Sequence, residues 1–182
     1  MTTDMERRTF WCWLGAIVVA GAILRLPLLG SVPPPMYIDE YSNGYDAYSI
    51  LLTGMDQHGA RYPLFFRALD DYRTPLHIYM SVPVTMVFGF GGMQTRLPYA
   101  LCGILAILAA GCIGQTLFGS REGLFTAALT ALSPWDVQFG RMALTHPIPL
   151  TALIPLGLCF LISGVRGRPR RLVAGFALMG LS

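Results

Sequence analysis

The chain has 182 residues, of which 54% are hydrophobic and only 13% are charged, and its mean hydropathy is +0.54. Soluble domains carry about 25% charged residues, so this composition excludes an ordinary soluble domain and indicates a membrane protein. The net charge of +3 is small, and no run of basic residues is interleaved with aromatic ones, which argues against a nucleic-acid-binding protein.

The cysteines give no sign of a metal centre or of a disulfide framework. All four lie inside apolar stretches, at Cys12, Cys102, Cys112 and Cys159, without the spacing of metal ligands. We interpret them as small packing residues and predict no metal site in the protein itself. Dependence on a divalent metal stays an open alternative.

Long apolar stretches follow one another along the chain. The first covers residues 10–29, close to the roughly 20 residues that cross a bilayer, and it has no cleavage site for a signal peptidase. Further spans are predicted at about 97–118, 123–139 and 147–164, and a fifth, 172–182, is cut short by the end of the chain. The sequence therefore predicts an all-α, polytopic membrane protein, and we expect residues 1–182 to be the amino-terminal part of a longer transmembrane domain.

The segment 76–92 decides the orientation of the later spans. If it crosses the bilayer, the arginine cluster in 166–171 faces outside, against the preference of arginine for cytoplasmic loops. If it lies along the surface, that cluster and the arginines near the amino terminus both face inside. Pro83 and the glycines at 89, 91 and 92 also favour a surface helix. We predict a long outer loop, 30–96, that contains short juxtamembrane helices.

Two stretches far apart in the sequence meet at the outer face in this topology. One carries the acidic pair Asp39 and Glu40, just after the first span, and the other runs from Arg141 to His146. Their convergence indicates a functional site. The competing interpretation is structural: Asp39 caps a surface helix that runs from about Glu40 to Thr53 and stops at Gly54.

At these positions the chain resembles the GT-C membrane glycosyltransferases, and most of all the bacterial relatives of protein O-mannosyltransferases and of the lipid A aminoarabinose transferases. The resemblance rests on the acidic pair after the first span and on a set of short stretches in consistent order. These are Asp71-Tyr72-Arg73-Thr74-Pro75-Leu76-His77-Ile78-Tyr79, Val87-Phe88-Gly89, Arg96-Leu97-Pro98, Leu117-Phe118-Gly119 and Ser133-Pro134-Trp135 followed by Phe139-Gly140-Arg141. They are specific for the superfamily and uninformative about the substrate.

The resemblance implies a reaction and a set of residues for it. Such enzymes transfer a sugar from a polyprenyl-phosphate donor to an acceptor outside the cytoplasmic membrane. The reaction needs a base near the acceptor hydroxyl and cations near the phosphate. Asp39 stands at the position of the family's catalytic carboxylate, and Glu40 beside it would orient the site. The donor itself is the only cofactor-like group expected.

Several residues are candidates for binding the donor phosphate, each with a simpler alternative. Arg141 matches a family arginine, but it could be a helix-end charge facing headgroups. Arg96 and Arg25 lie at membrane boundaries, where arginine is common in any case. Tyr72 and Arg73 complete the set, although a tyrosine in this loop also fits the aromatic belt of a membrane interface, and Arg73 replaces an acidic residue of the aminoarabinose branch. His146 is a further candidate, where many relatives carry an acid.

The sequence leaves a second class of function open. A polytopic transporter subunit would place ionisable residues in the middle of its spans, and the spans 97–118 and 147–164 have none there. A non-catalytic membrane scaffold is the third interpretation. We expect a multi-pass protein of the cytoplasmic membrane, with its site facing outside and with an acceptor that the sequence does not identify. Residues 1–182 alone are expected to be inactive.

Overall fold

The computed structural model describes residues 4–68, 71–144, 148–165 and 170–180. Within these ranges the chain forms eight helices and one antiparallel pair of short strands, so the predicted all-α fold class is confirmed. The elements are α1 (Asp4–Arg25), α2 (Ile38–Thr53), β1 (Phe66–Ala68), β2 (Asp71–Arg73), α3 (Leu76–Phe88), α4 (Gly92–Leu117), α5 (Ser120–Leu132), α6 (Pro134–Gly140), α7 (Ile148–Val165) and α8 (Arg170–Gly180).

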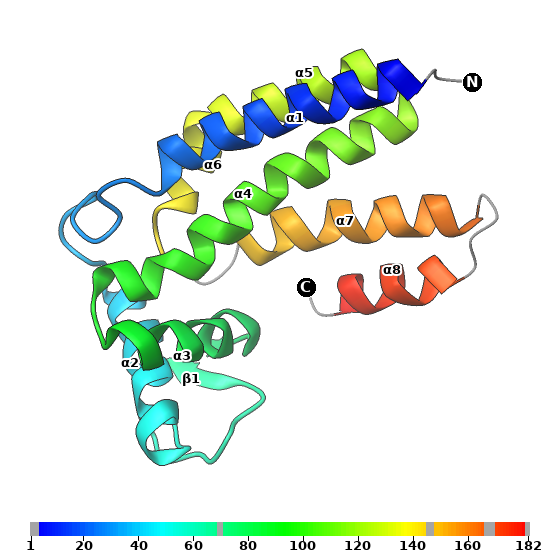
Figure 1. The fold of residues 1–182 in the computed structure, drawn as a ribbon. Coiled ribbons are helices and arrows are strands. Elements are labelled where there is room, and N and C mark those ends of the chain that lie inside the picture. The colour runs from blue at the N-terminus through cyan, green and yellow to red at the C-terminus, as the bar shows by residue number, and fades with distance from the viewer. Residues whose placement is uncertain (1–3, 69–70, 145–147, 166–169, 181–182) are drawn as a thin grey trace.

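Helix α4 is the centre of the molecule. It contacts α5 and α1 on one side and α7 on another, and α8 packs on α7 (Figure 1). At the amino-terminal end of α4, helices α2 and α3 and the β1–β2 hairpin form a small lobe below the long helices (Figure 1). The site described below lies where this lobe meets α4.

Two of the described helices are long and apolar enough to cross a membrane, with spans at Arg8–Arg25 and Gly92–Leu117. Helix α3 is apolar but has only 13 residues. At 1.5 Å per residue it is about 20 Å long, which is shorter than the hydrocarbon core of about 30 Å.

Small residues allow α4 and α5 to approach closely. A Cβ added to Gly123 of α5 would lie 2.7 Å from the backbone nitrogen of Gln115 and 2.7 Å from the carbonyl oxygen of Gly111, both on α4. Close approach through glycine is typical of helices that pack in membranes. Phe10 and Leu14 of α1 then pack against Ile107 of α4 and close a shared core.

The lobe has a core of its own. Ala47 and Ile50 of α2 pack with Phe66 of β1 and Ile78 of α3. Helix α2 ends at Thr53 because Gly54 adopts the left-handed conformation, with φ 70°, and its N–H donates to the carbonyl of Ile50 at 2.9 Å. The predicted stop of this helix at Gly54 is therefore confirmed.

Other boundaries differ from the predictions. The predicted span 123–139 is divided into α5 and α6 at Ser133, because Pro134 has no N–H to continue α5 and starts α6 instead. The first helix ends at Arg25 rather than at residue 29. The β1–β2 hairpin was not predicted: the outer loop was expected to contain helices only.

Candidate active site at the start of helix α2

A buried ion pair joins Glu40 of α2 to Arg96 of α4. The guanidinium Nε donates to Glu40 Oε1 and Nη2 donates to Oε2, both at 2.8 Å, and Nη1 donates to the carbonyl of Leu29 at 3.1 Å. Both residues have no exposed surface. Such a two-pronged contact fixes the carboxylate plane as well as its position.

Two backbone groups complete the shell of Glu40. The N–H of Ala143 donates to Oε1 at 2.7 Å, and the N–H of Tyr37 donates to Oε2 at 3.0 Å. Burial alone would raise the pKa of this carboxyl, but the hydrogen bonds from Arg96, Ala143 and Tyr37 and the charge of Arg96 outweigh it, so the pKa lies below its usual 4.5. Glu40 is therefore an ionised carboxylate sealed inside the protein.

Asp39, the neighbouring residue, has a different environment. Its Oδ1 accepts from Nη2 of Arg73 at 2.7 Å, and 45% of its side chain is exposed, against 6% for Arg73. Arg73 comes from β2, so the hairpin delivers the cation to the first turn of α2. The interpretation of Asp39 as a helix cap is wrong: the cap residue is Tyr37, and it is the Glu40 side chain that accepts from the Tyr37 N–H.

Asp39 and Arg73 line a surface pocket of about 230 Å³. Its other walls come from α2, from the loop that follows α2 and from β1, namely Ile38, Ser42, Gln57, His58 and Ala68. Pockets for drug-sized ligands measure about 300–1,000 Å³. This pocket therefore suits a group of the size of one sugar or one amino-acid side chain, and it is too small for a polyprenyl chain.

Buried carboxylates hold the loop wall of this pocket in place. Asp46 of α2 accepts from the backbone N–H of Gln57 at 2.9 Å, and Asp56 accepts from the N–H of His58 at 2.9 Å. Gln57 Nε2 also donates to the hydroxyl of Ser42 at 3.1 Å. Burial raises the pKa of Asp46. Gln57 and His58 were not predicted from the sequence, where the only signal for this turn is Asp56, which can accept from the N–H two residues further on, followed by Gly59.

The other predicted arginines bind backbone carbonyls. Arg25 has no exposed surface, and its Nη1 donates to the carbonyls of Gly21 and Ala131 at 3.1 Å. Arg141 donates through Nη1 to Leu24 and Arg25 and through Nη2 to Pro27 and Val32, at 2.7–3.2 Å. Arg141 thus ties the end of α6 to the end of α1. The structure does not bring Arg25 or Arg141 onto the pocket wall beside Asp39.

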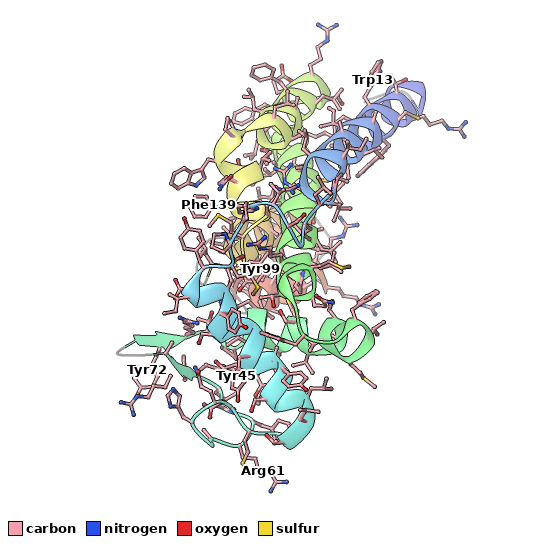
Figure 2. The ribbon with its side chains drawn as sticks, turned by 90° about the vertical axis from the view of Figure 1, so that its left-hand side faces the viewer. Trp13, Tyr45, Arg61, Tyr72, Tyr99 and Phe139 are labelled. Atoms are coloured by element: carbon pink, nitrogen blue, oxygen red, sulfur yellow. The ribbon has the colours of Figure 1, made fainter. Side chains whose placement is uncertain are left out.

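The remaining predicted residues lie outside this cluster. Tyr72 is 66% exposed on the hairpin and points away from the molecule, as does Arg61 below it, whereas Tyr99 of α4 lies in the interior (Figure 2). His146 lies outside the described residues. Within the described ranges no group of three or more His, Cys, Asp and Glu residues could hold a metal ion.

Comparison with known proteins assigns the family. A family model described as dolichyl-phosphate-mannose-protein mannosyltransferase matches residues 72–182, which is more than half of the chain. No curated protein and no solved structure matches it. The match includes Arg73, Arg96 and Arg141, while Asp39 and Glu40 precede it. The chain therefore belongs to the dolichyl-phosphate-mannose-protein mannosyltransferase family, the membrane glycosyltransferases of the GT-C type that use a polyprenyl-phosphate sugar.

Proposed function

We propose that the protein transfers a sugar from a polyprenyl phosphate to the hydroxyl of an acceptor at the outer face of the cytoplasmic membrane, with Asp39 as the base. The family supports the glycosyl transfer and the lipid-phosphate donor. The acceptor, the side of the membrane and the role of each residue belong to the proposal.

The chemistry is a single displacement. The acceptor oxygen forms a bond to the anomeric carbon as the bond from that carbon to the phosphate oxygen breaks, and the electron pair leaves with the polyprenyl phosphate. Asp39 takes the acceptor proton. Because attack comes from the face opposite the leaving group, the configuration at the anomeric carbon is inverted. The leaving group is already an anion, so no general acid is needed.

One observation carries the assignment of the base. Of the two neighbouring carboxylates, Asp39 is partly exposed and lines the pocket, whereas Glu40 is sealed by Arg96 and two backbone N–H groups. A base must come within hydrogen-bond reach of the proton that it takes. Glu40 has no exposed surface, so its role is to hold α2 against α4.

The cation that meets the donor phosphate is the second part of the proposal. Arg141 remains the arginine predicted for it, and it would have to release some of its backbone carbonyls to do so. Arg73 already lies on the pocket wall beside Asp39. A phosphate contact from either residue would be charge-assisted and two-pronged.

Replacing Asp39 by asparagine tests the base. The variant keeps the shape of the side chain and an oxygen that accepts from Arg73, but it removes the basic oxygen. Loss of a general base lowers the rate by about 10²–10⁴-fold, so we expect the initial transfer rate of the full-length protein to fall by that factor, with the protein still in the membrane.

Asp56→Asn is the matched control. It removes a carboxylate charge from the same lobe, and asparagine can still accept from the N–H groups of His58 and Ala60. Asp56 supports the loop wall but does not line the pocket, and the variant keeps the oxygen that accepts both N–H groups, so it should keep its activity. Near-normal transfer by Asp39→Asn would show that Asp39 is not the base.

A further inference from the structure

Asn43 is a buried amide one turn after the acidic pair on α2. Its residue is only 2% exposed. Three positions after Glu40 and four after Asp39, it lies on the side of the helix that carries both carboxylates. Asn43 belongs to no motif in the sequence, and it has no part in the bond-making steps of the proposed reaction.

Both ends of this amide have a partner of fixed polarity. Oδ1 accepts from Nη1 of Arg73 at 2.7 Å, and Nδ2 donates to the carbonyl of Ala143 at 2.9 Å. A guanidinium only donates and a carbonyl only accepts, so these partners dictate the orientation of the amide. Asparagine is the side chain of this length that supplies one acceptor and one donor.

Arg73 transmits this constraint to the base. Its Nη1 is held by Asn43 while its Nη2 donates to Oδ1 of Asp39, both at 2.7 Å. The guanidinium is planar and rigid, so fixing one amino group fixes the direction of the other. The hydrogen bond from Asn43 therefore also determines the direction from which Arg73 contacts Oδ1 of Asp39.

The same amide also sets the position of the segment 141–144. Glu40 accepts from the N–H of Ala143, and Asn43 donates to its carbonyl, so α2 holds both backbone groups of one residue. Ala143 has no exposed surface. Asn43 therefore stands between two parts of the chain, the hairpin that supplies Arg73 and the segment that follows α6.

We propose that Asn43 is a positioning residue for transfer: it aims the Arg73 guanidinium that orients the Asp39 carboxylate, and it locks that pair to the segment 141–144. The inference rests on the proposed function, because it requires Asp39 to be the base. It adds that the geometry of the base depends on an amide that touches no substrate. A displacement of about 1 Å in a reacting group can lower a rate by about 10²-fold.

A double-mutant cycle on kcat tests this role. Asn43→Ala, Arg73→Gln and the double variant are made in the full-length protein, and kcat and KM are measured against donor and acceptor. Asn43→Ala should lower kcat by roughly 10–100-fold, with a much smaller change in either KM. If Asn43 acts through Arg73, the kcat of the double variant should be no lower than that of Arg73→Gln, because both changes disrupt the same contact to Asp39.

Ser81→Ala is the matched control for a lost buried hydrogen bond. Ser81 is 2% exposed, its hydroxyl donates to the carbonyl of His77 at 3.0 Å within α3, and it does not line the pocket. This variant should lower the melting temperature and leave kcat unchanged. Asn43→Ser, which keeps a polar group in the buried position, is measured in parallel, so that the cycle can be completed if the alanine variant does not fold.

Two results would overturn the inference. One is a kcat of Asn43→Ala equal to that of the wild type, with only the melting temperature reduced. The other is a pair of losses that multiply in the double variant, which would mean that Asn43 and Arg73 act independently. Asp39→Asn is assayed beside them: if it keeps full activity, the proposed base is wrong, whereas its inactivity together with a normal Asn43→Ala refutes only the positioning role.

Discussion

At the scale of single residues, two adjacent carboxylates have been given opposite surroundings. Glu40 faces α4 and is paired with Arg96 inside the protein. Asp39 faces the pocket, with 45% of its side chain exposed. Adjacent positions on a helix are about 100° apart, so one residue can be buried while the next reaches solvent. This difference in exposure is the reason why we propose Asp39, and not Glu40, as the base.

Glu40→Gln is expected to destabilise the protein. The variant leaves the guanidinium of Arg96 buried without a counter-charge, and breaking such a pair from one side costs about 3–5 kcal/mol. The pKa of Glu40 is lower in the folded than in the unfolded protein, so its contribution to stability is present above about pH 4.5 and is lost as the pH falls below that value. The melting temperature of the wild type should exceed that of the variant at pH 7, and the gap should narrow near pH 4. A gap that does not change with pH would show that the charge of Glu40 is not the cause.

The sequence predicted both Asp39 and Arg73 as candidate site residues, but not the contact between them. The acidic pair after an apolar span was visible as a motif, and the stop of α2 at Gly54 followed from the conformational freedom of glycine. The contact from Arg73 to Asp39 joins residues 34 positions apart. It depends on a hairpin of two three-residue strands, which are too short to show a clear strand pattern in the sequence. Asn43 was missed for a similar reason: a single buried amide carries no spacing signal.

At the scale of elements, the interruption between α5 and α6 determines where the segment after α6 lies. Ser133 and Pro134 divide an apolar run into α5 and α6, and the hydroxyl of Ser133 accepts from the N–H of Asp136 at 3.3 Å. The redirected chain then delivers Arg141 to the end of α1 and Ala143 to α2. The hydrophobic pattern alone predicted one continuous helix here, because it does not record where a proline lacks a hydrogen-bond donor.

Gly123→Ala should weaken the packing of α5 on α4. The added methyl group would lie 2.7 Å from backbone atoms of α4, which cannot rotate away. Overpacking of this kind typically costs about 1–3 kcal/mol, so the melting temperature in detergent should fall. Gly15→Ala on α1 is the comparison, because its Cβ meets nothing within 4 Å. It should be neutral or slightly stabilising, since alanine favours helices by about 1 kcal/mol over glycine. Equal effects of the two changes would refute this account of the α4–α5 contact.

At the scale of the whole molecule, the small lobe and the far ends of the long helices lie apart along α4 (Figure 1). The proposed topology puts the lobe at the outer face of the membrane and the carboxyl end of α7 on the cytoplasmic side. In a background without native cysteines, a cysteine at Ser42 should react in intact cells with an impermeant thiol reagent, and one at Ser163 should react only after permeabilisation. The reverse labelling pattern would show that the proposed orientation is wrong and that the pocket faces the cytoplasm.

The contact at Ala143 has a consequence for how this protein tolerates change. Glu40 and Asn43 form hydrogen bonds with the main chain of that residue and none with its side chain. The side chain at this position is limited only by the small space around it. A substitution that fits leaves both hydrogen bonds intact, whereas one residue inserted between α6 and Ala143 would present a different peptide group to α2. Position 143 should therefore accept another small residue, provided that the length of the segment 141–144 is kept and that Arg141 retains its contacts with the end of α1.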